Sequence, residues 1–273
     1  MPDSDVDASS SLGGAAAGRV GNLHFSAAIA ALVVLYLACA ELSLLLAIAP
    51  GFSTPVWPPS GIALAALLLY GVRLWPGIWL AAFLANAGDG APWLAVMAMA
   101  TGNTLEALCA CWLAHRFIGR NVELDHPEAA FRFAGIIASS GLVAASIGTA
   151  ALALSGVLPA GVRLVNWYTW WQGDIAGMIV VAPFLLAWLR HLERSDGGLD
   201  RARYTEVSAF AAALLATFAI VFALAEAQSD LARTLTFLLI PFVAWAVCLF
   251  SERAVTATVL AITGVAVWAT VDE

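Results

Sequence analysis

Long apolar stretches, each bounded by charged residues, proline or glycine, follow one another along the chain from residue 24 onward. A helix needs about 20 apolar residues to cross the hydrocarbon core of a bilayer. The stretches predict membrane helices at 24–49, 59–72, 75–88, 92–118, 128–155, 165–190, 204–225, 231–250 and 254–271. The pattern therefore predicts an all-α, polytopic integral membrane bundle of about nine transmembrane helices.

Composition supports this interpretation. Hydrophobic residues make up 62% of the 273 residues and charged residues 11%, against about 45–50% and about 25% in a soluble domain. Residues 1–22 differ from the rest, because they are rich in Ser, Gly, Ala and Asp and carry no basic segment before an apolar core. This composition predicts a disordered cytoplasmic tail over 1–22 and a membrane-embedded domain over 23–273.

The arginines indicate the orientation. All twelve basic residues are Arg, and a cytoplasmic N-terminus leaves only Arg163 and Arg233 in outside segments. The inside segments then hold Arg19, Arg73, Arg116, Arg120, Arg132, Arg190, Arg194, Arg201, Arg203 and Arg253. Because cytoplasmic loops of membrane proteins are enriched in basic residues, this distribution predicts a multi-pass protein of a bacterial inner membrane with its N-terminus in the cytoplasm.

The predicted helices at 59–72 and 75–88 are short, at about 14 residues or about 21 Å each. Two interpretations are open for them. They form a re-entrant hairpin with Arg73 at its tip, or they cross a locally thinned bilayer and bring Arg73 to the cytoplasmic headgroups. The second is favoured, because an arginine without a partner inside the bilayer is unfavourable.

Polar side chains at membrane depth are the candidates for function. They are energetically unfavourable in lipid, and such residues usually belong to functional sites. Asn103 and Glu106 are three residues apart and share one helical face, and Trp170 and Asp174 share another. The candidate ligand-binding residues are Trp57, Ser60, Asn86, Asn103, Glu106, Trp170 and Asp174. With Glu41, they predict a polar cavity in the outer half of the membrane, open toward the periplasm, for a small-molecule ligand.

Each candidate also has a structural interpretation. Asn103, Glu106 and Asp174 can simply hydrogen-bond neighbouring helices. The tryptophans suit an interfacial belt, and Ser60 suits the N-cap of the helix at 59–72. Two further features favour structure alone. Gly173-x-x-x-Gly177 is typical of a helix-packing face, and Asp125 to Glu128 is typical of a helix N-cap.

The sequence contains no nucleophile elbow, phosphate-binding loop or zinc-protease motif, so no catalytic residue and no enzyme is predicted. The four cysteines lie in apolar runs without a Cys-x-x-Cys pair, which predicts no metal site. No basic patch suggests a nucleic-acid partner. The identity of any cofactor stays unknown at this point.

Five motifs, taken in order, resemble one family. They are Val56–Ala63, Tyr70–Gly77, Ala85–Asn86, Gly102–Ala107 and Trp170–Asp174. Together they are similar to the first type of bacterial membrane-associated sensor domain, of the MASE family. The resemblance implies a sensory input module, and it implies that the recurrent polar positions are Asn86, Asn103, Glu106 and Asp174. It does not imply a particular ligand.

The resemblance also implies partners. Such a domain is typically followed by a cytoplasmic output such as a diguanylate cyclase or a histidine kinase, in cyclic di-GMP signalling or a two-component system. The chain ends at Glu273 without such motifs, so we expect either a fragment or a module that signals through a partner, with a homodimer also open. A small-solute transporter or substrate-capture subunit is the alternative function, and a membrane anchor that recruits partners is a third.

Overall fold

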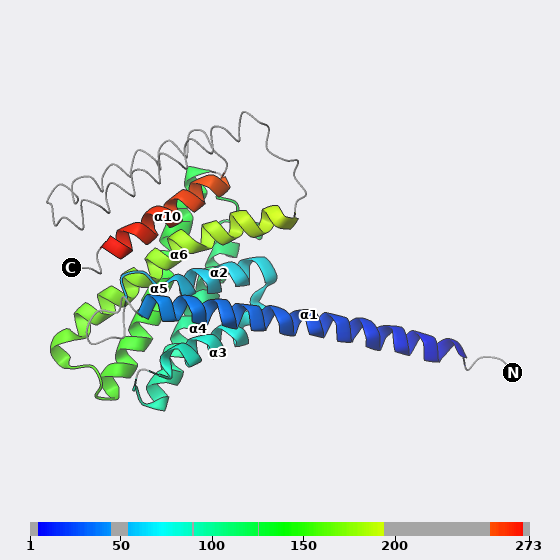
Figure 1. The fold of residues 1–273 in the computed structure, drawn as a ribbon, viewed down its shortest axis with the longest axis horizontal. Helices are drawn as coiled ribbons and strands as arrows, with labels where there is room; N and C mark the ends of the chain where they lie inside the picture. The colour runs from blue at the N-terminus through cyan, green and yellow to red at the C-terminus, as the bar shows by residue number, and fades with distance from the viewer. Residues whose placement is uncertain (1–4, 45–53, 89, 125, 194–251, 270–273) are drawn as a thin grey trace.

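The computed structural model describes residues 5–44, 54–88, 90–124, 126–193 and 252–269. Within these ranges the chain forms seven α-helices, two short 3₁₀ turns (Val72–Leu74 and Ala160–Val162) and no strand (Figure 1). The helices are α1 (Asp5–Leu44), α2 (Pro58–Tyr70), α3 (Trp75–Asn86), α4 (Trp93–Phe117), α5 (Pro127–Leu154), α6 (Arg163–Glu193) and α10 (Glu252–Ala269). The predicted all-α class is confirmed for this part of the chain.

Four segments of these helices are long and apolar enough to cross a bilayer, namely Phe25–Leu44, Trp93–Phe117, Pro127–Leu154 and Ala160–Arg190. All four coincide with predicted spans to within five residues at either end. The predicted helices at 204–225 and 231–250 lie outside the described residues. The total of nine crossings and the cytoplasmic N-terminus therefore stay predictions.

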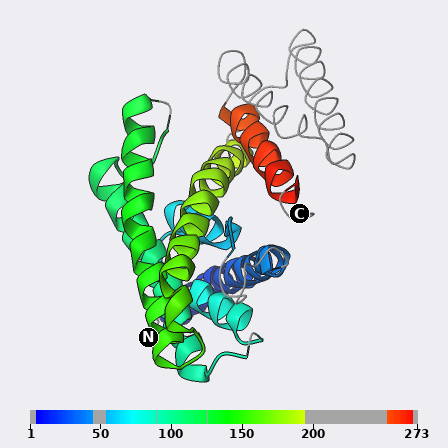
Figure 2. The same cartoon turned by 90° about the vertical axis from the view of Figure 1, so that its left-hand side faces the viewer.

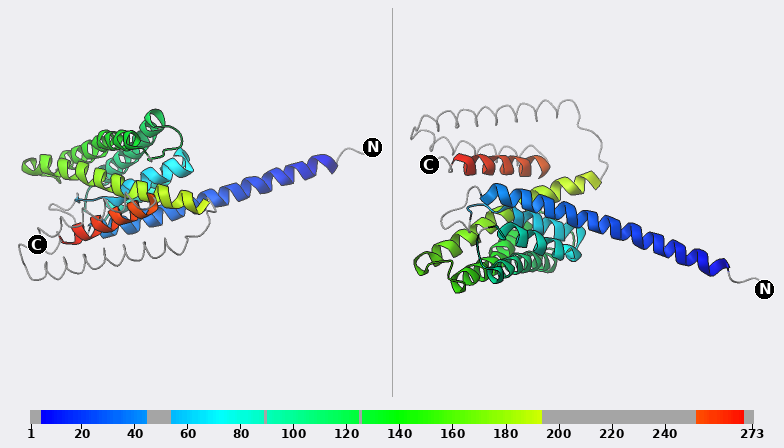
Figure 3. Two further views of the ribbon diagram at one scale, coloured as in Figure 1. Left: turned by 90° about the horizontal axis from the view of Figure 1, so that it is seen from above. Right: turned by 60° about the horizontal axis from the view of Figure 1, so that its bottom comes forward.

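Helix α1 is much longer than its apolar part. It begins at Asp5, whereas its apolar segment begins at Phe25. The N-terminal half extends away from the other helices (Figures 1 and 3). It covers most of the segment 1–22, for which the sequence predicts a disordered cytoplasmic tail, and that assignment stays a prediction.

Helices α2 and α3 are short, with 13 and 12 residues, or about 20 Å and about 18 Å. The turn between them begins at Gly71, which has φ +92°, a conformation that residues with a Cβ rarely adopt. Arg73 in this turn is exposed. The turn lies at the same end of the bundle as the C-terminal part of α6 (Figure 1).

Helix α2 occupies the middle of the described bundle and packs against α1, α4 and α6. Helix α6 in turn lies between α5 and α10, as Figure 2 shows. The main hydrophobic core therefore forms around α2, where Leu64, Leu67 and Ile78 are completely buried together with Tyr36 of α1. Any polar group on the inner face of α2 is consequently held between three helices.

A close backbone contact positions α2 on α6. The Trp57 N–H donates a hydrogen bond of 2.9 Å to the Gly173 carbonyl. A Cβ at Gly173 would strike the Thr54 carbonyl, and one at Gly177 would strike the Trp57 carbonyl. The predicted packing face of Gly173 and Gly177 is thus present. Its partners are the chain just before α2 and α2 itself, where a Cβ at Gly61 would strike the Gly177 carbonyl.

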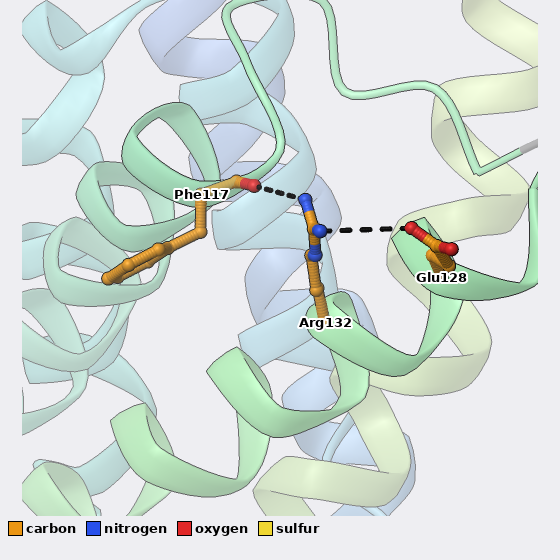
Figure 4. A network of polar contacts seen from close by, with 3 residues as sticks. All are labelled: Phe117, Glu128 and Arg132. Atoms are coloured by element: carbon orange, nitrogen blue, oxygen red, sulfur yellow. Dashed lines mark hydrogen bonds and ion pairs between the residues drawn. The ribbon is translucent and has the colours of Figure 1, made fainter.

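The junction of α4 and α5 differs from the expected N-cap. His126, rather than Asp125, is the N-cap residue of α5, and no side-chain cap hydrogen bond is found there among the described residues. Glu128 instead lies 3.8 Å from Arg132 in an exposed ion pair. Arg132 also donates a hydrogen bond of 3.3 Å to the Phe117 carbonyl at the end of α4 (Figure 4). Arginine therefore satisfies a helix C-terminus here, where its charge also suits the helix dipole.

Candidate functional site

Three predicted site residues meet at one point between α2, α4 and α6. The Ser60 Oγ lies 3.1 Å from Glu106 Oε2 and 2.9 Å from Asp174 Oδ1, both within hydrogen-bonding distance. These side chains are 3%, 1% and 0% exposed. Because they are 46 and 114 residues apart in sequence, only the folded bundle brings them together. We call Ser60, Glu106 and Asp174 the carboxyl cluster.

Local structure explains why Ser60 faces the two acids. The N-cap of α2 is Trp57, with prolines in the next two positions, so Ser60 lies in the first helical turn and caps nothing. The expected N-cap role of Ser60 is therefore wrong. Since Pro58 and Pro59 begin the helix ahead of it, the serine side chain is free to point toward α4 and α6.

A count of hydrogens constrains the carboxyl cluster. A serine hydroxyl has one hydrogen to donate and lone pairs that accept. Ser60 can donate to only one of the two carboxyl oxygens next to it, so the second contact is favourable only if that carboxyl keeps its own proton and donates it to Ser60 Oγ. Two ionised carboxylates side by side in a buried site would also be strongly unfavourable. We conclude that the pair retains at least one proton.

Infrared spectroscopy tests this count. In the full chain in detergent at neutral pH, we expect the C=O stretching band of a protonated carboxyl. The double variant Glu106→Gln/Asp174→Asn should lose the band, because it removes both acids. Glu41→Gln is the matched control, since Glu41 is exposed on α1 and lies outside the carboxyl cluster. A wild-type spectrum without the band would mean that both acids are ionised.

Further polar atoms lie buried around the carboxyl cluster. Within the part of the chain that the structure describes, no hydrogen-bond partner is found for Glu106 Oε1, Asp174 Oδ2, Asn103 Oδ1 or the Tyr36 hydroxyl. The Tyr36 hydroxyl lies beside Trp57 and Asn103 and within electrostatic reach of both acids. Three of these four atoms are acceptors only. The site is therefore rich in acceptors and poor in donors, which favours a cation or a ligand that donates hydrogen bonds.

Helix α5 comes close to the same acids through a glycine. A Cβ at Gly141 would lie 3.5 Å from Glu106 Oε1 and 3.2 Å from the Trp171 ring. The Trp171 indole N–H donates 2.9 Å to the Ala138 carbonyl. Tyr36, Gly141 and Trp171 thus adjoin the site without having been predicted in it. A tyrosine in the middle of an apolar span was the one sequence signal that could have indicated Tyr36.

The other predicted site residues have different positions. Asn86 is buried, but its amide donates 2.7 Å to the Ala82 carbonyl of its own helix. Trp170 packs in a second hydrophobic cluster with Met99 and Leu152. Glu41 is exposed on α1, away from the acids. These contacts favour a role in helix packing for Asn86 and Trp170 rather than a role in ligand binding. Trp57 lies beside Tyr36, next to the carboxyl cluster.

The sequence predicts a polar cavity open toward the periplasm. In the described residues, the side chains of the carboxyl cluster are instead buried against one another. Asn103 is 4% exposed, and the carboxyl cluster is as closed as the hydrophobic core. In the described ranges, no group of three or more His, Cys, Asp or Glu side chains is arranged to hold a metal ion. The structure thus has a closed polar cluster that would have to separate before a ligand could enter.

Comparison with known proteins identifies the family of the chain. The model of the MASE1 family, the first type of membrane-associated sensor domain, matches residues 27–273. The match includes every residue of the carboxyl cluster and both helix-packing glycines of α6. No curated protein and no solved structure matches the chain.

Proposed function

Because the chain belongs to the MASE1 family, whose members are membrane-associated sensory domains commonly found in signalling proteins, we propose that it is the input module of a bacterial signalling protein of the inner membrane. The observation that carries the proposal is the Ser60 hydroxyl held between Glu106 and Asp174. The Ser60 hydroxyl joins α2 to α4 and α6. A ligand that competes with Ser60 for the two carboxyl groups therefore changes how these three helices pack.

The proposed mechanism has two states. In the closed state the two acids share Ser60 and at least one proton. In the open state, a cationic or donor-rich small molecule binds the free oxygens of Glu106, Asp174 and Asn103 and separates α2 from α4 and α6. Such a ligand shifts the equilibrium only by its difference in affinity for the two states.

The short helices provide the path for the signal. Helix α2 runs from Ser60 in its first turn to the α2–α3 turn that carries the exposed Arg73. A displacement of α2 at its N-terminus therefore moves that turn, which the arginine distribution assigns to the cytoplasm. We propose that a cytoplasmic output of the diguanylate cyclase or histidine kinase type, in an adjoining segment or a partner, responds to this movement.

Ligand-dependent thermal stability tests the sensing site. The full chain in detergent is screened against small molecules, with cations and amines included, by its melting temperature. We expect at least one compound to raise the melting temperature of the wild type and to fail with Glu106→Gln and Asp174→Asn, because each variant removes a proposed ligand group. Glu41→Gln is the matched control and should respond as the wild type does. Stabilisation that is equal in all four proteins would place the ligand elsewhere.

A transporter is the second candidate function. Acids near the middle of the membrane and a short helix that begins with two prolines also suit a substrate-binding site between broken helices. Uptake by proteoliposomes separates the two functions. A compound that binds in the thermal assay and also accumulates in wild-type vesicles, but not in Asp174→Asn vesicles, would favour transport over sensing.

A further inference from the structure

A groove with an amphipathic lining lies between α4 and α5, at the opposite ends of these helices from Trp93 and Leu154. Its volume is about 790 Å³, within the range of about 300–1,000 Å³ that small-molecule sites occupy. Seven residues line it: Leu113, Arg116, Phe117, Arg132, Gly135, Ile136 and Ser139. None of them belongs to the carboxyl cluster, so the groove is a separate feature.

Charge is confined to one end of the groove. Arg116 and Phe117 are in the last turn of α4, and Arg132 is in the second turn of α5. From Arg132 the groove continues along α5 to Ser139, seven residues or about 10 Å away. The Ser139 hydroxyl donates 2.7 Å to the Gly135 carbonyl of its own helix, so this part of the groove presents an essentially apolar surface.

The arginines have weak partners. The Arg116 guanidinium lies 5.7 Å from the centre of the exposed Phe117 ring, and no ion pair involves Arg116 in the described ranges. Arg132 pairs with Glu128 (Figure 4) at 3.8 Å. The two side chains are 59% and 86% exposed. Exposed ion pairs of this kind contribute little to stability. A phosphate could therefore replace Glu128 on Arg132 with little loss.

We propose that this groove binds one anionic phospholipid, with its phosphate between Arg116 and Arg132 and an acyl chain along Leu113, Ile136 and Gly135. Two arginines at headgroup depth above an apolar channel match the shape and charge of such a lipid. Basic pockets between transmembrane helices bind anionic headgroups in this way. A soluble phosphate would contact the arginines alone and would leave the apolar part of the groove unused.

Gly135 allows the acyl part of the site to be tested without disturbing the protein. A Cβ added there meets no atom within 4 Å, and most residues favour a helix more than glycine does. Gly135→Leu should therefore fill the groove while the bundle stays folded. Arg163 is the control for charge, because it lies at the start of α6, next to the other end of α5, where it donates to the Leu158 carbonyl.

The experiment measures lipid retention by the full chain after delipidation in detergent, using native mass spectrometry and the melting temperature. Phosphatidylglycerol, phosphatidylcholine with the same acyl chains, and inorganic phosphate are added separately. We expect one bound phosphatidylglycerol and stabilisation by that lipid alone. Arg116→Gln and Arg132→Gln should each weaken binding about fivefold, Gly135→Leu should abolish it, and Arg163→Gln should leave it unchanged.

Three results would overturn the proposal. Equal retention of phosphatidylcholine would show that the arginines do not select an anionic headgroup. Stabilisation by inorganic phosphate equal to that by the lipid would show an anion site without an acyl site. Undiminished lipid binding by folded Gly135→Leu, judged by an unchanged melting temperature without lipid, would show that the lipid lies elsewhere.

Discussion

Replacing Gly177 with alanine should destabilise the protein by about 1–3 kcal/mol, the usual effect of forcing an extra methyl group into a packed core. We expect the upper part of this range, because the added Cβ would strike the Trp57 carbonyl. A backbone carbonyl cannot rotate away as a flexible side chain can. The segment before α2 would have to move, and Ser60 would move with it. Reversible unfolding in mixed micelles measures the change.

Gly135→Ala is the matched control for Gly177→Ala. It makes the same chemical change inside a neighbouring helix, but the new Cβ meets no atom within 4 Å. We expect unchanged or slightly higher stability, by up to about 1 kcal/mol, because alanine favours a helix more than glycine does. Equal effects of the two substitutions would mean that the contact of α6 with Trp57 does not limit stability.

A second pair of substitutions should change stability in opposite directions. Glu106→Gln supplies two N–H donors to a site in which the Asp174 and Asn103 oxygens lack them. We expect it to raise the free energy of unfolding by about 1 kcal/mol, the typical net contribution of one hydrogen bond. Asn103→Asp adds a third acid and removes donors. We expect it to lower the free energy of unfolding by about 1–3 kcal/mol or more, because a buried charged group without partners is expensive.

Glu106→Gln and Asn103→Asp each preserve the volume of the side chain. The difference between their effects on stability therefore reports hydrogen bonding and charge rather than packing. The same micelle unfolding measurement applies, and Glu41→Gln on the exposed face of α1 should have no effect. If Glu106→Gln destabilised the protein as much as Asn103→Asp, the site would need its second acid, and the conclusion that acceptors are in excess would be wrong. A more stable Glu106→Gln that no longer responds to a ligand would show that the acid is kept for function.

Much of the fold follows from local sequence. The described spans α4, α5 and α6 begin and end within a few residues of the predicted ones, because a helix across a bilayer needs a continuous apolar segment whose limits are visible as Arg, Pro and Gly. The turn at Arg73 and the short helices on either side of it were predictable for the same reason. The helix ends were less predictable. The N-cap residue of α5, for example, is His126 rather than Asp125.

The candidate site was predictable in part. A carboxyl group in a span is unfavourable enough to be conspicuous, and Glu106 and Asp174 are therefore readily found. Asn86 is just as polar, but its amide is satisfied within its own helix at Ala82. Trp170 is as buried as a site residue yet packs against Met99. Whether a polar side chain is satisfied locally or by a distant helix depends on its rotamer and neighbours, which a one-dimensional pattern does not contain.

The sequence by itself determined the all-α class of the described part, the positions of its apolar helices and the two acids that matter most, because all of these depend on transfer between water and lipid. Only the tertiary structure decided that Ser60 lies between these acids, that Gly177 lets the Trp57 carbonyl approach, and that the polar residues form a closed cluster instead of an open cavity. The physical reason is that hydrogen bonds and close packing join residues over 100 positions apart, whereas hydropathy acts on each segment separately.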